Sequence, residues 1–274
     1  MGFDPSRSGY WCRQCVRVLL GFVIAGSATL HAAELRVLTE EYPPVSFQTA
    51  GRASGLGSEV VEEIQHRIGS HVTIQVVPWA RGYRMVLDDP DVALFATMRT
   101  PERESLFKWV GPLTTVTTSF YAKHGATIRL NSLADAKAAA SIVVPREYYS
   151  HQVLRNLGFT NLEPVTTPEM TVRMLLAGHG VLIAADNLTL PALLTEAGAS
   201  RNDVELVYSF MQSQNYIAFS RGTPDELVQS WQSSLDDMKR DGSFARIYEK
   251  WLPGESPPGI KPMADTGLPL HQGP

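Results

Sequence analysis

The sequence predicts an α/β fold built on a mostly parallel sheet. Three short runs of β-branched and apolar residues, 35–39, 72–77 and 92–95, have the composition of strands. Each run is followed by a stretch with helical periodicity or a helix-start signal, and the same alternation resumes after residue 125. Strands that alternate with helices at this spacing are typical of a parallel sheet.

Helices are expected after each of these runs. Val60, Val61, Ile64 and Ile68 share one helical face, and Gly69 ends the pattern. A second helix is expected to begin near Trp79. A third is expected at Thr100, because threonine suits an N-cap and Pro101 suits the first helical position.

The second half of the chain repeats the same unit and ends in two helices. Strands are expected at 141–144, at 181–185, where the strand delivers Asp186, and at 216–219. Helices are expected at 148–157, at 172–176 before Gly178, at 224–241 before Gly242, and at 244–251. Beyond Pro253 the sequence is rich in proline and glycine, so residues 253–274 are predicted to form a disordered tail.

The N-terminus has the pattern of a secretory signal peptide over residues 1–33. Arg7, Arg13 and Arg17 precede an apolar run at 18–30, which is too short to span a membrane. Cys12 and Cys15 precede that run and would be removed with it, so the mature protein is expected to lack cysteine and a lipid anchor. Export to the periplasm is therefore predicted.

The composition argues against several classes of function. The formal net charge of −4 and the pI near 6.0 do not favour nucleic-acid binding. The seven histidines are scattered without metal-ligand spacing. The Gly55-Leu56-Gly57 segment lacks the third glycine of a dinucleotide fingerprint, so no cofactor is expected.

Arg103 is the first candidate for a binding residue. In a helix that begins at Thr100, Arg103 would lie in the first turn, where its charge opposes the helix dipole. Free backbone N–H groups, the positive helix end and the guanidinium would together suit a carboxylate. The alternative is that Arg103 is solvated or paired with Glu102 or Glu104.

Four segments together resemble the family 3 extracellular solute-binding proteins of bacterial ABC transporters, over residues 35–252. They are Tyr42-Pro43-Pro44, residues 91–107 with Thr100-Pro101-Glu102-Arg103, residues 175–186, and the C-terminal segment made of residues 235–242 and 247–252. The resemblance implies the type II periplasmic-binding-protein fold, with two α/β lobes joined by a two-crossover hinge. It implies lobe 1 at 34–121 plus 218–252, lobe 2 at 122–217, and crossovers near 120–124 and 214–219.

The resemblance also implies how a ligand is held in the cleft between the lobes. Arg103 looks like the arginine that holds the ligand carboxylate, Asp186 like the acceptor of the α-ammonium, and Tyr42 like the aromatic residue that packs on the ligand. Such a set suits an amino-acid zwitterion. For Asp186, the alternative is a strand-end carboxylate that caps the next helix.

The sequence departs from the family pattern on both sides of the expected cleft. Ala96 and Met98 replace small hydroxyl residues, which leaves Thr97 as the nearest hydroxyl. In lobe 2, Arg146-Glu147-Tyr148-Tyr149 replaces a Gly-Thr dipeptide, so Arg146 or a tyrosine hydroxyl would substitute for a backbone cradle.

Trp79, Arg81 and Arg99 are further candidates near the carboxyl ends of strands. Trp79 and Tyr83 share a helix face, and the alternative is that they complete a core. Additional arginines near the cleft would favour acidic or polar ligands.

The sequence therefore predicts a monomeric periplasmic protein that binds a small polar solute and is not an enzyme. The expected ligand is an amino acid or related carboxylate, and the expected partner is an ABC transporter permease in the inner membrane. Two alternatives stay open. One is a dehydratase-like enzyme that uses Glu40, Glu41 or Asp186 as an acid, and the other is a ligand-sensing partner of a membrane receptor.

Overall fold

A computed structural model of the chain describes Met1 and residues 35–259. The predicted signal peptide beyond Met1, with Cys12 and Cys15, lies outside the described residues, and so does the predicted tail from residue 260 onward. In the described part, no helix combines the length and the apolar character needed to cross a membrane.

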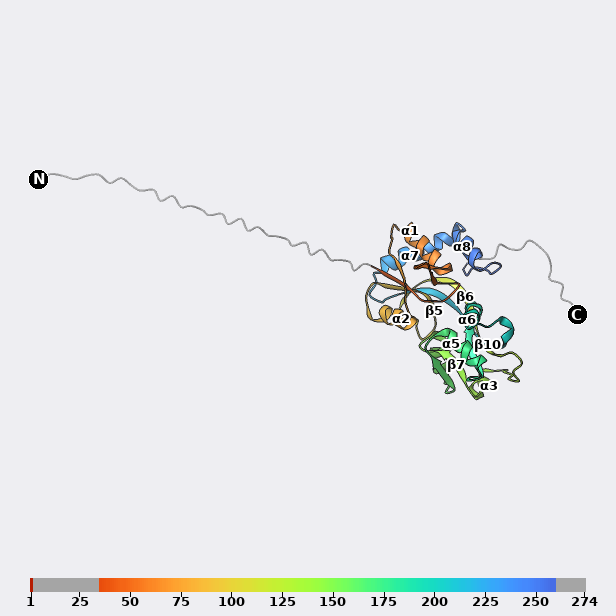
Figure 1. The fold of residues 1–274 in the computed structure, drawn as a ribbon. Helices are drawn as coiled ribbons and strands as arrows, with labels where there is room; N and C mark the ends of the chain where they lie inside the picture. The colour runs from red at the N-terminus through yellow and green to blue at the C-terminus, as the bar shows by residue number, and fades with distance from the viewer. Residues whose placement is uncertain (2–34, 260–274) are drawn as a thin grey trace. The chain divides into compact units, whose positions relative to one another are not determined.

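The centre of the fold is a sheet of eight strands in the order β4-β1-β5-β10-β6-β9-β7-β8 (Figure 1). The strands are β1 (Arg36–Thr39), β4 (Ile74–Val76), β5 (Val92–Arg99), β6 (Lys108–Lys123), β7 (Ile142–Pro145), β8 (Leu162–Val165), β9 (Leu182–Asp186) and β10 (Val204–Phe219). β4, β1 and β5 are parallel to one another, and so are β9, β7 and β8. The expectation of a mostly parallel sheet was wrong at its centre, because β10 is antiparallel to both β5 and β6, and β6 is antiparallel to β9.

Helices pack on the strands of both halves, which confirms the α/β class. The helices are α1 (Leu56–Arg67), α2 (Trp79–Asp88), α3 (Leu133–Ala138), α4 (Tyr149–Asn156), α5 (Pro168–Leu176), α6 (Leu190–Glu196), α7 (Asp225–Arg240) and α8 (Ser243–Trp251). A short hairpin of β2 (Phe47–Thr49) and β3 (Arg52–Ser54) and a 3-10 turn, η1 (Arg201–Asp203), complete the described elements.

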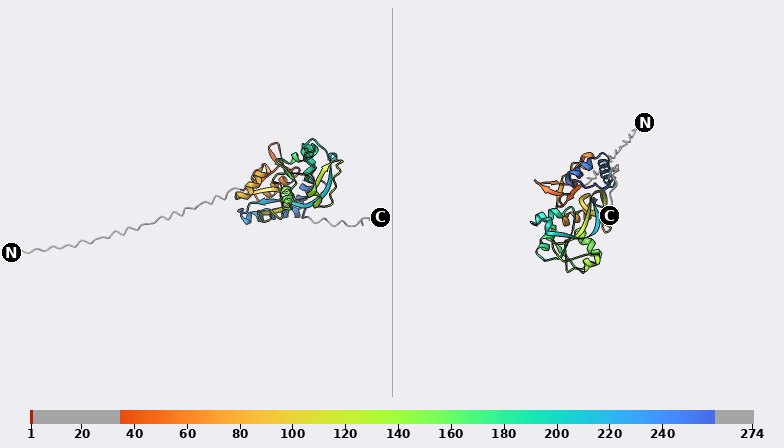
Figure 2. Two further views of the ribbon diagram at one scale, coloured as in Figure 1. Left: turned by 90° about the horizontal axis from the view of Figure 1, so that it is seen from below. Right: turned by 90° about the vertical axis from the view of Figure 1, so that its right-hand side faces the viewer.

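The buried residues divide the described chain into two lobes. In lobe 1, residues from β1, β5, α1, α7 and α8 share a core that includes Val60, Phe95 and Trp231. In lobe 2, residues from β7, β9 and the helices between them form cores around Leu154 and Val172. β6 and β10 each have sixteen residues and contribute to both lobes, as the views in Figure 2 also show. The predicted lobe boundaries stay a prediction.

The helix expected at Thr100 is absent. β5 continues to Arg99, past the expected end at residue 95, and residues 101–106 form successive turns before β6 begins at Lys108. The Arg103 N–H donates to the Thr100 carbonyl at 3.0 Å, and the Leu106 N–H donates to the Arg103 carbonyl at 3.0 Å. These hydrogen bonds join residues three positions apart, so the segment forms tight turns and not an α-helix. Arg103 therefore does not lie at a helix end.

Gly55 supports the segment that carries Tyr42. Its φ is +109°, and a Cβ there would lie 2.6 Å from the Val45 carbonyl oxygen. We expect Gly55→Ala to destabilise the fold by about 3 kcal/mol in urea unfolding, because strain and a backbone clash add. Gly51→Ala is the matched control: its φ is +77° and no atom lies within 4 Å of the added Cβ, so only the left-handed strain of about 1 kcal/mol applies. If both variants lose the same free energy of unfolding, the predicted clash with the Val45 carbonyl oxygen is wrong.

Candidate functional site

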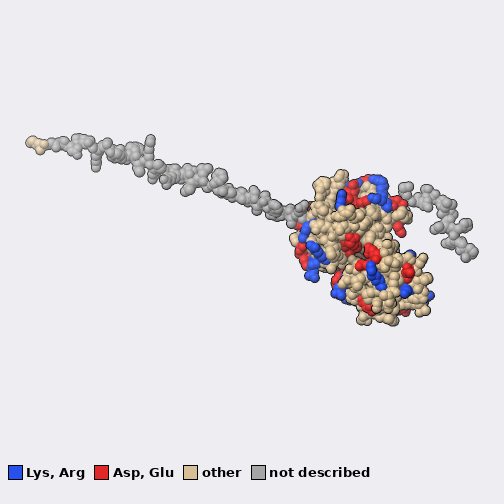
Figure 3. All heavy atoms as spheres, viewed as in Figure 1, with Lys and Arg blue, Asp and Glu red and all other residues tan. Residues whose placement is uncertain are grey.

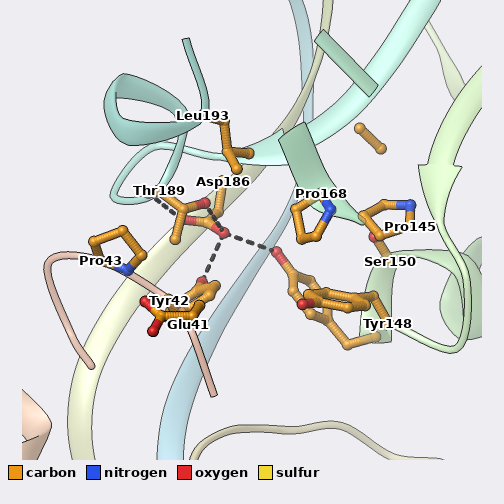
Figure 4. A pocket seen from close by; sticks show the side chains of 12 residues that line it. Glu41, Tyr42, Pro43, Pro145, Tyr148, Ser150, Pro168, Asp186, Thr189 and Leu193 are labelled. Atoms are coloured by element: carbon orange, nitrogen blue, oxygen red, sulfur yellow. Dashed lines mark hydrogen bonds between the residues drawn. The ribbon is translucent and has the colours of Figure 1, made fainter. Parts of the chain in front are cut away.

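Asp186 lies at the end of β9 and collects hydrogen bonds from both lobes (Figure 4). Its side chain is buried, and its Oδ2 accepts hydrogen bonds from the Tyr42 hydroxyl at 2.6 Å and the Thr189 hydroxyl at 2.9 Å. The Tyr149 hydroxyl lies 3.4 Å from the same oxygen. Because Tyr42 follows β1 in lobe 1, the contact from Tyr42 crosses between the lobes.

The other oxygen of Asp186, Oδ1, holds the backbone at the start of the next helix, which is the alternative role that the sequence allows. Oδ1 accepts hydrogen bonds from the backbone N–H groups of Leu188 and Thr189, each at 3.0 Å, just before α6 begins at Leu190. Asp186 therefore organises the start of the next helix and faces Tyr42 across the cleft at the same time. Oδ1 serves the local role alone, whereas Oδ2 accepts hydrogen bonds from both Tyr42 and Thr189.

Arg103 is buried to 1% exposure in the turn after β5. Its Nε donates to Gln152 Oε1 at 3.1 Å, and its guanidinium lies 5.0 Å from the Trp79 ring and 4.8 Å from the Tyr83 ring. Its Nη2 has no hydrogen-bond partner among residues 35–259, and no carboxylate of these residues forms an ion pair with it. Burial lowers the pKa of Arg103. The result is a desolvated cation with an unused donor.

Trp79 and Tyr83 hold Arg103 from one face of α2. Their rings stack with centroids 5.2 Å apart, as expected for residues four positions apart on a helix. The Trp79 indole N–H donates to the Glu147 carbonyl of lobe 2 at 2.9 Å. Trp79 thus contacts Arg103 and also forms a bridge between the lobes.

Glu40 follows β1 and is a buried carboxyl at the same interface. It is 4% exposed, and its Oε2 accepts a hydrogen bond from the Tyr148 hydroxyl of lobe 2 at 2.5 Å. Burial raises the pKa of Glu40 to about 8, although the Tyr148 hydrogen bond and the charge of Arg103 act in the opposite direction. From the sequence, Glu40 is a candidate only for a catalytic acid. Its place after a parallel strand, where α/β proteins bind ligands, was the signal for a cleft position.

The other four predicted residues lie apart from this cluster. The Thr97 hydroxyl donates within its own strand to the Leu94 carbonyl at 2.9 Å. Arg99 pairs with Glu104 and lies over the rings of Trp109 and Tyr216. Arg81 and Arg146 are exposed, and Arg146 lines the outer part of the cleft.

Two hollows lie at this interface. The inner cavity has a volume of about 30 Å³ and is lined by residues of both lobes, among them Tyr42, Tyr149 and Asp186. The outer hollow has a volume of about 550 Å³, and its charged lining residues are Glu40, Glu41, Arg146, Glu169 and Glu196. Acidic side chains gather near the middle of the face drawn in Figure 3. Among the described residues, no three His, Cys, Asp or Glu side chains are grouped to hold a metal ion.

Comparison with known proteins places this arrangement in a family. The sequence profile of the bacterial extracellular solute-binding proteins, family 3, matches residues 35–254. The chain belongs to this family. The resemblance proposed from the four sequence segments is thereby confirmed.

Individual relatives of this family 3 solute-binding protein support the same fold. The L-cystine-binding protein TcyJ of Escherichia coli (strain K12) is 22% identical over 216 residues, which cover 77% of this chain and 79% of TcyJ. A histidine kinase sensor domain with similarity to periplasmic binding proteins superposes with a TM-score of 0.72 at 19% identity, covering 80% and 96% of the two chains. An ancestral arginine-binding protein bound to arginine superposes with a TM-score of 0.68 at 21% identity, covering 80% and 98%. The type II fold predicted from the sequence is confirmed.

Proposed function

We propose that this protein captures a small polar solute, an α-amino acid, between its lobes and delivers it to an ABC transporter permease. The observation that carries the proposal is the buried Arg103, whose Nη2 lacks a partner among residues 35–259 while Asp186 lies at the same interface. Tyr149 lies near both Arg103 and Asp186. Its hydroxyl is 3.4 Å from Asp186 Oδ2, and the charge of Arg103 is near enough to act against the rise in the pKa of Tyr149.

The roles of the two charged residues follow from the chemistry of a zwitterion. The ligand carboxylate would pair with the Arg103 guanidinium, which supplies charge-assisted donors in a site shielded from water. The ligand ammonium would donate to Asp186 Oδ2, where the Tyr42 hydroxyl now donates. The two groups of one small molecule would thus contact both lobes, which is what ligand-driven closure requires.

The relatives and the sequence support the cellular setting. TcyJ is named as a cystine-binding protein, and one structural neighbour is bound to arginine, so amino acids are the ligand class to test first. Together with the predicted signal peptide, membership of an extracellular family supports a periplasmic location. We propose that the protein acts there as a monomer.

A thermal-shift screen of the exported protein against amino acids, small carboxylates and polyamines tests the proposal. A ligand at about 100 times its dissociation constant stabilises a protein by about 2.7 kcal/mol, which raises the melting temperature measurably. We expect at least one amino acid to give such a shift, and polyamines, which lack a carboxylate for Arg103, to give none. If no amino acid stabilises the protein, the zwitterion site is wrong.

Glu40 favours one alternative, a dehydratase-like reaction in the same cleft. With its pKa raised to about 8, the Glu40 carboxyl holds a proton at neutral pH and has one of the properties of a general acid. Incubation with prephenate or arogenate, followed by a search for an aromatic product, separates this alternative from binding alone. The similarity to a sensor domain favours a second alternative, in which a membrane receptor recognises the closed form. Measuring solute uptake by cells that lack this protein distinguishes the two: uptake falls if the protein serves a transporter and is unchanged if it serves only a receptor.

A further inference from the structure

Together with Glu41 and Pro168, Tyr148 lies at the boundary between the two hollows of the cleft. Its side chain lines both the inner cavity of about 30 Å³ and the outer hollow of about 550 Å³. The inner volume suits a water molecule, whereas ligand sites are about ten times larger or more. An amino acid therefore does not fit in the inner cavity in this arrangement, and Tyr148 is the largest side chain at the boundary whose movement would enlarge that cavity.

The ring of Tyr148 is held by lobe 1, although its backbone belongs to lobe 2. Its hydroxyl donates to Glu40 Oε2 at 2.5 Å, and its ring lies 5.7 Å from the Trp79 ring. It packs against the apolar cluster of lobe 1 that contains Trp79 and Phe107. Separation of the lobes would remove all of these contacts together.

The adjacent tyrosine, Tyr149, is more deeply buried and contacts both lobes. Tyr149 is buried, and its hydroxyl forms a hydrogen bond of 3.0 Å with the Thr118 hydroxyl on β6 and lies near Asp186 at the end of β9. Tyr149 also packs within the lobe 1 core around Phe95, so it is held from both lobes.

Tyr148 differs in that it lines both hollows and its hydroxyl bonds to Glu40 of lobe 1. The residue before it, Glu147, has a φ of +62°, and its carbonyl accepts the Trp79 indole N–H.

We propose that Tyr148 determines which solutes the cleft accepts by filling the space that the ligand side chain takes. In this arrangement the ring and the ligand side chain exclude each other, and the Tyr148 hydroxyl holds the two lobes together through Glu40. The inference rests on the proposed function. It adds that the size of the accepted side chain depends on a residue that departs from the family pattern.

Two variants separate the size of the ring from the hydrogen bond of the hydroxyl. Tyr148→Ala removes the ring. We expect the affinity for amino acids with long side chains to rise about tenfold more than the affinity for free alanine used as a ligand, both measured by isothermal titration calorimetry. Tyr148→Phe keeps the ring but releases Glu40. We expect it to strengthen binding of all amino-acid ligands alike by about fivefold, because apparent affinity rises with the fraction of molecules competent to bind.

Tyr208→Phe is the matched control, since Tyr208 is a half-buried tyrosine on β10 that packs against the lobe 2 core around Phe120. We expect its affinities to equal those of the wild type. If Tyr148→Ala weakens short and long ligands equally, Tyr148 supports the bound ligand and the proposal is overturned.

A measurement without ligand keeps this proposal distinct from the proposed function. By small-angle X-ray scattering, we expect Tyr148→Phe to have a larger radius of gyration than the wild type and Tyr208→Phe. If the wild type binds no amino acid but Tyr148→Phe expands, the proposed function fails and the contact between Tyr148 and Glu40 stands. If the wild type binds amino acids but neither Tyr148 variant changes affinity or scattering, the role of Tyr148 is overturned and the proposed function stands.

Discussion

Arg103→Met is expected to weaken amino-acid binding by about 2 to 5 kcal/mol while leaving the fold at least as stable as the wild type. The loss in affinity follows because the variant removes the only charged group proposed to pair with the ligand carboxylate in a buried site. The stability is maintained because Arg103 is a desolvated cation whose Nη2 has no partner among residues 35–259. An unpaired buried charge carries a desolvation cost, which a methionine side chain of similar length does not.

Calorimetric titration and urea unfolding of the same variant measure the two effects. Arg99→Met is the matched control, because Arg99 lies four residues earlier, is partly exposed and pairs with Glu104. That ion pair contributes at most about 1 kcal/mol to stability. Because Arg99 lies outside the proposed ligand site, Arg99→Met should keep the wild-type affinity for the ligand. If Arg103→Met binds the ligand as tightly as the wild type, Arg103 does not pair with the ligand carboxylate, and its role is limited to packing on Trp79 and Tyr83.

The stability of the protein is expected to fall as the pH rises from about 5 to about 8, because of Glu40. In the unfolded chain this carboxyl loses its proton near its ordinary pKa of 4.5, whereas in the folded protein burial raises its pKa to about 8. Between these values the unfolded state binds fewer protons at Glu40 than the folded state, so higher pH favours unfolding. At about 1.4 kcal/mol per pH unit, the Glu40 contribution amounts to about 4 kcal/mol across this range.

Urea unfolding of the wild type and Glu40→Gln across this pH range isolates the effect. Glutamine still accepts the Tyr148 hydrogen bond but carries no proton equilibrium, so its stability should decline less steeply with pH. Glu41→Gln, at the exposed carboxyl next in the chain, should retain the wild-type slope because Glu40 is intact. The Lys239 amine, whose pKa burial lowers to about 8, titrates at the upper end of this range in the wild type and in both variants, so its effect cancels when the slopes are compared. Parallel pH profiles for the wild type and Glu40→Gln would exclude Glu40 as the source.

The local elements were predictable where one periodic run coincides with one element. The run at 181–185 predicted β9 (Leu182–Asp186) and with it the position of Asp186, and the amphipathic pattern at 224–241 predicted α7. The sequence does not predict the long strand β6, because its buried and exposed residues do not alternate regularly. Its pairing with β10 is interrupted by several register shifts. In both long strands, pairing with distant segments determines the conformation more than local propensity does.

The burial of Arg103 has a different origin from the helix end that the sequence predicts. The sequence placed it at a helix end, but the local backbone is a turn, and the burial of its charge comes from Trp79 and Tyr83 on α2. The hydrogen bond between Glu40 and Tyr148 joins residues 108 positions apart, so no local pattern announces it. Contacts of this kind depend on how the two lobes meet, which a single sequence does not encode in any local spacing.

The position of β10 between β5 and β6 determines when each lobe can be completed during synthesis. Lobe 1 begins first along the chain, but β10 forms its central hydrogen-bonded connection, and its core includes Trp231 and Phe244 from the last two helices. Lobe 2 needs only the first half of β10, because the residues packed in its two cores end along the chain at Phe210. The lobe that the ribosome makes first is therefore the one that finishes folding last.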